Sequence, residues 1–146
     1  MPRGPGTETV SNLRFSVELD GVPFSGFCHV SGLESFIDLH EEGDGGQPDA
    51  KRRRPRPRSR TFGNLVLRRG FDSRRELWEW YRSVSMGRVD RRNGAIVVLD
   101  DSGEVVARIV FRGAWPCRWR LSALDALEPA VLMEEIELVV AEFQIE

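Results

Sequence analysis

Residues 70–87 read GFDSRRELWEWYRSVSMG, and they contain the one segment of the sequence with a clear helical pattern. Ser73 and Glu76 have the S-x-x-E spacing of a capping box, in which both side chains accept hydrogen bonds from backbone amides of the first turn. Four apolar residues at positions i, i+3, i+4 and i+7 form one stripe: Leu77, Trp80, Tyr81 and Val84. The pattern predicts a helix over residues 73–86 that ends at Gly87.

Trp78 lies outside the centre of that stripe, because consecutive residues are about 100° apart around a helix. Large aromatic residues on a second helix face are typical anchors of protein interfaces. We therefore expect Trp78 to contact a neighbouring subunit, with core packing inside the chain as the alternative. Trp80, which belongs to the stripe, and Trp115, which precedes the rigid Pro116, are expected in the core.

Segments with strand patterns lie on both sides of this helix. Apolar and polar residues alternate over 13–19, and Asp20-Gly21 predicts a tight turn into a return strand over residues 22–30. The final segment, residues 130–146, fits a helical stripe and a strand equally well, so its periodicity leaves both open. Further strands are predicted over residues 36–41, 61–67, 95–99 and 105–111.

A long loop is predicted over residues 42–60, where the apolar pattern stops. Glycines and prolines oppose regular structure there, and residues 51–60 carry Lys51 and six arginines. Three interpretations remain open for this charge: a solvated loop, a contact with an acidic partner or neighbouring subunit, or nucleic-acid binding. The last is the weakest, because no aromatic residues stand between the arginines to stack on bases.

The length of 146 residues fits one domain, expected over residues 13–146 after a flexible N-terminal segment over residues 1–12. No apolar run approaches the roughly 20 residues of a membrane helix, and the N-terminus has no apolar signal region. Cys28 and Cys117 are too few for a disulfide framework and are expected to be buried thiols. These features favour a chain made in a reducing cytoplasm, without membrane anchoring.

The charges are sorted along the chain, although the formal net charge is only −2. Residues 1–50, 51–92 and 93–146 carry net charges of −7 (2 basic, 9 acidic), +11 (15 basic, 4 acidic) and −6 (4 basic, 10 acidic). Either these are solvated surfaces, or a basic face meets the acidic face of an identical neighbour, a contact that builds rings or filaments. The candidate interface residues are Trp78, Arg68, Arg69, Arg52, Arg53, Arg54, Glu41 and Glu42.

The sequence offers no recognisable catalytic or metal site. His29 and His40 are the only histidines, and no CxxC, HExxH, P-loop or GxSxG motif is present. We therefore predict no catalytic residue, no cofactor and no metal ligand, and we expect a protein that is not an enzyme.

The order of the motifs resembles the inner tube proteins of contractile phage tails and related injection systems, the Hcp-like tail tube family. The resemblance covers residues 13–142. In the first half it rests on FSVELDG, VSGL, EEGDGG and NLVLRRG running into ELWEWY, which begin at residues 15, 30, 41, 64 and 76. In the second half it rests on RRNGAIVVLDDSG, FRGAWP and EEIEL, which begin at residues 91, 111 and 134.

This resemblance implies a small antiparallel β-barrel with one flanking helix, and it implies that residues 130–146 are strand. Six such subunits would form a ring, and stacked rings would form the hollow inner tube that sheath contraction drives outward. The implied partners are further copies of the chain, a sheath protein, a baseplate or tube-initiator protein and possible luminal cargo, with nucleic acid unlikely. The product would be a structural protein of a phage-tail-like particle made in the bacterial cytoplasm.

The arginine-rich stretch over residues 51–60 departs from the family pattern. It leaves two alternatives to the bulk tube subunit. One is the tube-initiating paralogue that joins the tube to the baseplate, and the other is a basic-loop module that binds nucleic acid.

Overall fold

A computed structural model of the chain describes residues 13–40 and 56–146. In the described part, ten strands and one helix are present. Every paired set of strands is antiparallel. In chain order the elements are β1 (Arg14–Leu19), β2 (Val22–Phe24), β3 (Phe27–Ser31), β4 (Ser35–His40), β5 (Arg56–Phe62), β6 (Leu65–Gly70), α1 (Glu76–Ser85), β7 (Arg92–Leu99), β8 (Val105–Leu121), β9 (Met133–Val139) and β10 (Glu142–Ile145).

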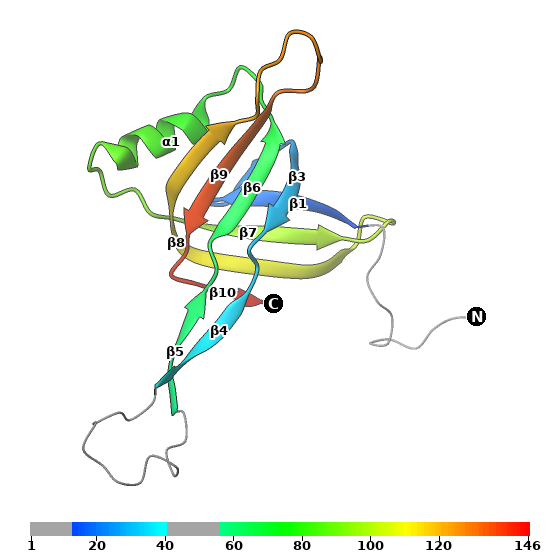
Figure 1. Cartoon of the computed structure of the whole chain (residues 1–146). Coiled ribbons are helices and arrows are strands. Elements are labelled where there is room, and N and C mark those ends of the chain that lie inside the picture. The colour runs from blue at the N-terminus through cyan, green and yellow to red at the C-terminus, as the bar shows by residue number, and fades with distance from the viewer. Residues whose placement is uncertain (1–12, 41–55) are drawn as a thin grey trace.

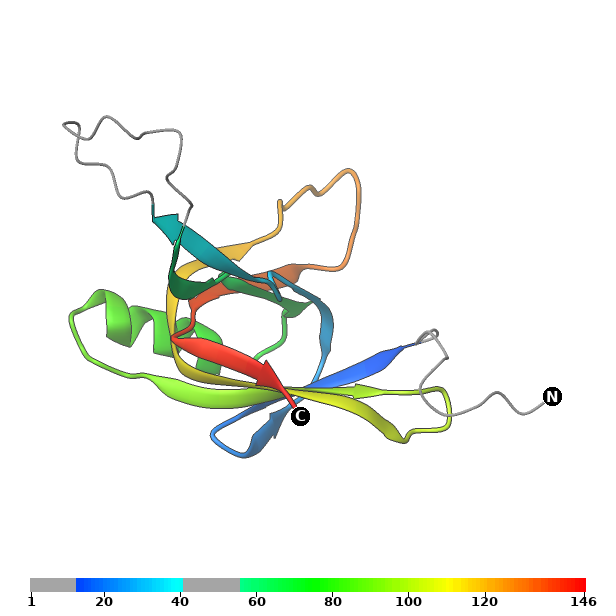
Figure 2. The ribbon, with the colours of Figure 1, turned by 90° about the horizontal axis from the view of Figure 1, so that it is seen from below.

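Eight strands form one curved sheet that curls into a small barrel, which is seen end-on in Figure 2. The strand order is β2-β1-β7-β8-β9-β6-β3, and β10 pairs with β8 beside that path. Strands β4 and β5 form a separate two-stranded ribbon that projects from one end of the barrel (Figure 1). The predicted fold class, an antiparallel β-barrel with one helix, is confirmed.

The long strand β8 belongs to two walls of this barrel. Residues 105–114 pair with β7, and part of this half also pairs with β10, whereas residues 115–121 pair with β9. The register shifts between Pro116 and Arg118, so that Cys117 is the extra residue of a bulge. We name the sheet β2-β1-β7-β8-β10 the first wall. The sheet β8-β9-β6-β3, which uses residues 115–121 of β8, is the second wall.

The core lies between the two walls and α1. Alternate residues of the strands point inward, as in the cross-strand rows of Val17, Ile96 and Ile109 in the first wall and Leu67 and Ile136 in the second. From the helix, Leu77 and Trp80 are fully buried in the same cluster, which confirms the predicted core position of Trp80.

The helix begins later than its sequence pattern predicts. The N-cap residue is Arg75, which has no side-chain cap hydrogen bond, so the predicted capping box of Ser73 and Glu76 is wrong. The carboxylate of Glu76 instead accepts a hydrogen bond from Arg69 Nη1 at 3.1 Å. The side chain of Glu76 is therefore engaged in a tertiary ion pair and does not cap the helix. The predicted end is confirmed, with Gly87 at φ +94° after the last turn.

Further boundaries differ from the predictions, whereas the strand assignment of the C-terminal segment agrees with the resemblance. The return strand over residues 22–30 is broken into β2 and β3 at Gly26, whose φ of +90° turns the chain from the first wall into the second. Residues 56–60 of the predicted loop belong to β5, and residues 42–55 lie outside the described part of the chain. The ambiguous C-terminal segment forms β9 and β10, as the resemblance implies.

Gly94 of β7 provides a test of how tightly the barrel is packed. A Cβ atom at this position would lie 2.4 Å from the carbonyl oxygen of Glu18 and 2.4 Å from the buried ring of Phe111. Gly94→Ala is therefore expected to lower the free energy of unfolding by about 2–3 kcal/mol, as overpacking does. Urea denaturation measures this change.

Gly70→Ala is the matched control, because Gly70 also lies in a strand but its added Cβ would meet only Val131 Cγ1, at 3.9 Å. Its free energy of unfolding should stay within about 0.5 kcal/mol of the parent. Equal midpoints for the two variants would contradict the packing described for Gly94.

Candidate functional site

The outward surface of the second wall carries two rows of side chains that are polar or charged at every position except Val66. They alternate along each strand with the buried residues of the core, so they lie on the opposite side of the sheet. The first cross-strand row contains Arg120, Glu135, Arg68 and His29, and the second contains Arg118, Glu137, Val66 and Ser31. We name these eight residues the polar face.

Opposite charges are neighbours on the polar face. Arg120 Nε lies 2.5 Å from Glu135 Oε2, and Asn64 Nδ2 donates a hydrogen bond to Glu137 Oε2 at 3.1 Å. Arg68, which was predicted as an interface residue, is exposed at the centre of the first row. Cross-strand ion pairs of this kind keep a sheet surface hydrated while they neutralise most of its charge.

The sequence contained a signal for this face that our sequence analysis did not use. Glutamates at 135 and 137 and arginines at 118 and 120 each recur with the period of two that a strand requires. The register that sets the arginines opposite the glutamates is a property of the folded sheet, and it became visible only in the structure.

The second wall also has two free edges. They are the outer side of β3 and the outer side of residues 115–121 in β8, and within the described residues neither is hydrogen-bonded to another strand. Free strand edges offer backbone N–H and C=O groups that pair readily with a strand of another chain. Both edges therefore present backbone groups with which a strand of another chain could pair.

Arg69 is buried inside the chain and offers no surface to a neighbour. Its Nε donates to Glu134 Oε1 at 3.0 Å and its Nη1 donates to Glu76 Oε1 at 3.1 Å, while Trp119 Nε1 donates to Glu134 Oε2 at 2.9 Å. The guanidinium carbon of Arg69 lies 5.4 Å from the centroid of the Phe27 ring. We therefore remove Arg69 from the candidate interface, because this network is a structural element of the barrel.

This network predicts a non-additive pair of substitutions. Arg69→Met should lower the free energy of unfolding by about 3–5 kcal/mol, because it leaves the buried carboxylate of Glu134 without its ion-pair partner. Glu134→Leu should lower it by a similar amount, because the buried Arg69 then keeps only the partly exposed Glu76. The double variant should lose less than either single variant, since both charges are then gone. Urea denaturation of the three variants gives the coupling free energy.

The pair of Arg120 and Glu135 on the outward face, whose side chains are 54% and 19% exposed, serves as the control for this cycle. Its removal should change the free energy of unfolding by less than about 1 kcal/mol, because water screens both charges. Strictly additive losses for Arg69 and Glu134 would contradict the coupling described here.

Trp78 packs against the chain on one side and faces outward on the other. Its ring centroid lies 4.8 Å from that of Trp119 and 6.0 Å from that of Tyr81, and its residue surface is 36% exposed. With Phe71, Arg75 and Trp119 it lines a shallow depression of about 260 Å³. Its predicted contact with a neighbouring subunit remains a prediction. The other predicted interface residues, Arg52, Arg53, Arg54, Glu41 and Glu42, lie outside the described part of the chain.

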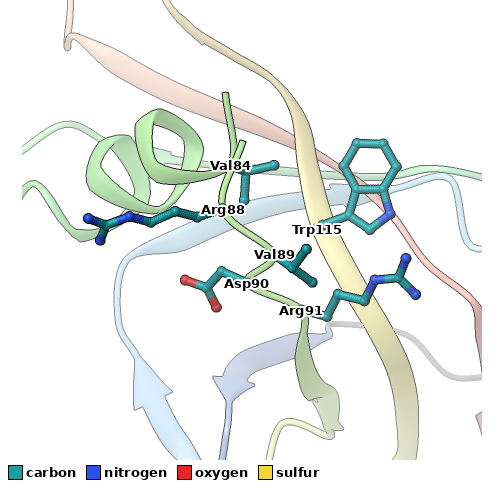
Figure 3. Close-up of a pocket in the computed structure, with 6 residues that line it drawn as sticks. All are labelled: Val84, Arg88, Val89, Asp90, Arg91 and Trp115. Atoms are coloured by element: carbon teal, nitrogen blue, oxygen red, sulfur yellow. The ribbon is translucent and has the colours of Figure 1, made fainter. Parts of the chain in front are cut away.

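A second depression, of about 120 Å³, lies between the end of α1 and β8 (Figure 3). Val84, Val89 and the half-buried Trp115 line it, together with Arg88, Asp90 and Arg91. Its volume is well below the roughly 300 Å³ at which small-molecule sites begin. Trp80 Nε1 donates to the backbone oxygen of the lining residue Asp90 at 2.9 Å, and the Arg92 guanidinium lies 4.5 Å from the centroid of the Trp80 ring. These contacts fix the end of the helix to the barrel.

Both cysteines are exposed, so the prediction of buried thiols is wrong. Cys28 lies on the edge strand β3, and Cys117 is the bulge residue of β8. Desolvation of the Cys117 thiol and, after it, the hydrogen bond that its Sγ donates to Glu137 at 3.4 Å raise its pKa to about 11. A thiol with this pKa is almost entirely protonated at neutral pH.

The raised pKa of Cys117 predicts that its thiol is alkylated slowly. Since Glu137 contributes to the raised pKa, its substitution should change the rate of alkylation. In a Cys28→Ser background at pH 8.5, only about 0.3% of a thiol with a pKa near 11 is thiolate, the reactive form. Glu137→Gln removes the negative charge beside the sulfur, so the pKa should fall and the rate of reaction with iodoacetamide should rise several-fold. Alkylation rates measured from pH 7 to 10 give both pKa values. An unchanged rate in the Gln variant would contradict this role of Glu137.

Two further features of the described residues bear on the kind of protein. In residues 13–40 and 56–146, no group of three or more His, Cys, Asp and Glu side chains is arranged to hold a metal ion. In the same residues, no helix is long and apolar enough to cross a membrane.

The curved barrel, its single flanking helix and its free sheet edges define a β-barrel of the tail-tube type. The two depressions described above are small, whereas the edges and the polar face are extended. The chain belongs to the T4-like virus tail tube protein gp19 family, whose model matches residues 11–144.

Solved structures of similar proteins share this fold. A chain of the PVC sheath-tube complex of an extracellular contractile injection system, in the extended state, is 24% identical with a TM-score of 0.81, over 97% of this chain and 93% of that one. A chain of the anti-feeding prophage baseplate is 25% identical with a TM-score of 0.76, over 97% of both chains. Hcp1 from Flavobacterium johnsoniae is 17% identical with a TM-score of 0.59, over 90% of this chain and 93% of that one. Comparison with curated proteins gave no match.

Proposed function

We propose that this chain is the inner tube subunit of a contractile injection system. Six copies form a ring, the rings stack into a hollow tube, and contraction of a surrounding sheath drives the tube into its target. The observation that carries the proposal is the match of the family model to residues 11–144. The two free edges of the second wall support it. The role is mechanical, so no residue is assigned a catalytic step.

Edge pairing between neighbours would build the ring. If β3 of one copy lies beside residues 115–121 of the next, the second walls join into one continuous sheet that closes around the ring axis. Closure leaves no unpaired edge, which is how natural β-structures avoid open-ended association. The short strands and the bulge at Cys117 limit how far the pairing can slip.

In such a ring the polar face lines the channel. Trp119 points to the core side of β8, and its ring contacts Trp78 of α1. The helix therefore lies on the side of the second wall away from the polar face, which is the outside of the ring. A sheath protein would surround that outer side, and hydrated cargo would pass along a lumen lined by charged groups. We further propose that the chain is made in the bacterial cytoplasm and assembled there with sheath and baseplate proteins.

Electron microscopy of the purified chain tests this function. Negative-stain images at high concentration should show hollow rings with six-fold end-on views, and side views of stacked rings. Sedimentation velocity over a dilution series should give a hexamer that dissociates as the concentration falls. A particle with the mass of one chain at every concentration, and no rings in the images, would contradict the proposal.

A further inference from the structure

The loop of residues 122–132, which joins β8 to β9, presents three large apolar side chains to water. Leu127 is 92% exposed, Leu124 is 79% exposed and Val131 is 74% exposed. Single exposed apolar residues are common on protein surfaces, but three of them within one short loop make that loop a candidate interaction site. We name this segment the β8–β9 loop. It also contains Asp125 and Glu128 and no basic residue.

Hydrogen bonds hold the β8–β9 loop in a defined shape. At its base, Ser122 N donates to the backbone oxygen of Met133 at 2.9 Å, and Met133 N donates to Ser122 Oγ at 2.9 Å. Near its tip, Leu127 N donates to Asp125 Oδ1 at 2.9 Å. The apolar side chains are therefore displayed on a structured loop, and their exposure carries a free-energy cost that a partner would remove.

The β4–β5 ribbon has the complementary character. Phe36 is 50% exposed and Ile37 is 53% exposed, and as consecutive strand residues they lie on opposite faces of the ribbon. At its base, Phe62 packs on Phe143 of β10 with 5.0 Å between the ring centroids. The rest of the ribbon has both faces in water, and a two-stranded ribbon of this kind is only marginally stable without a cover. Its two strands carry three arginines and one acid, Asp38, and Arg60 is exposed.

The loop and the ribbon project from opposite ends of the barrel (Figure 1). Complementary surfaces at opposite ends of one molecule meet when copies are arranged head to tail. The acidic, apolar loop and the basic, apolar ribbon match in both charge and hydrophobicity.

We infer that the β8–β9 loop of one copy covers the β4–β5 ribbon of a second copy in the adjacent ring. The inference rests on the proposed function, and it names the surface through which rings stack. Leu124, Leu127 and Val131 pack on the face of the ribbon that carries Ile37, and Glu128 lies near Arg60, the cross-strand partner of Ile37 on that face. This axial contact is separate from the edge pairing of the second wall, so removing it leaves rings intact.

The double variant Leu124→Asp and Leu127→Asp tests the apolar part of the contact. It should form rings like the parent but need at least about tenfold more protein to form stacks, because two carboxylates would be buried in the contact. Met86→Asp with Val105→Asp is the matched control, since these residues are 72% and 62% exposed and lie outside both surfaces. The control should stack like the parent. Negative-stain images and sedimentation velocity report rings and stacks separately.

A charge exchange tests the pairing itself. Glu128→Arg and Arg60→Glu should each weaken stacking, and the combined variant should restore it. Asp125 is left unchanged, because its side chain holds the tip of the loop. Unchanged urea midpoints for all variants verify that these exposed substitutions leave the barrel folded.

Each result that differs from these expectations would overturn one particular claim. Stacking of the Leu124→Asp and Leu127→Asp variant at the parent's concentration would overturn the inference and leave the proposed function standing. If this variant formed neither rings nor stacks, the contact would lie between subunits of one ring, and its assignment to adjacent rings would be overturned. Failure of the combined charge variant to restore stacking would overturn the pairing of Glu128 with Arg60. A parent chain that forms no rings would contradict both the proposed function and the inference.

Discussion

The barrel depends on the continuity of β8, the one strand whose hydrogen bonds belong to both walls. Its first half holds β7 and β10, its second half holds β9, and α1 packs against it. The bulge at Cys117 lets the strand bend without losing its partners, because one extra residue increases the local twist. Two separate strands would leave the walls free to move apart, and the core between them would open to water.

The ion pair of Arg69 and Glu134 adds a constraint on register. These residues are directly paired across β6 and β9 and are fully buried at the end of the core. A slip of either strand by one residue would turn its own charge to the other face, leave the charge on the partner strand buried and unpaired, and bring outward-facing residues into the core. A buried ion pair contributes little net stability, but a buried charge without its counter-charge, as in any other register, costs several kcal/mol. The pair therefore selects the alignment on which the polar face depends.

The sequence predicted those features that depend on neighbours along the chain. The stripe of α1, the end of the helix at Gly87 and the hairpin of β7 and β8 were found by periodicity and turn residues, and the resemblance supplied the C-terminal strands. The start of α1 was missed because Arg69 binds Glu76 across the fold. The break at Gly26 was missed because the alternating pattern continues through a corner. The polar face was missed because its rows join strands that are far apart in sequence, and only the register of the sheet brings them together.

The placement of the β8–β9 loop and the β4–β5 ribbon at opposite ends gives the molecule a direction (Figure 1). A head-to-tail column of such subunits has chemically different ends, because one end always shows acidic loops and the other always shows basic ribbons. Proteins that close the two ends must then differ in charge, and neither could take the place of the other. Copies would also add to and leave the two ends of the column at different rates. The column would stop changing length only when its second end is closed.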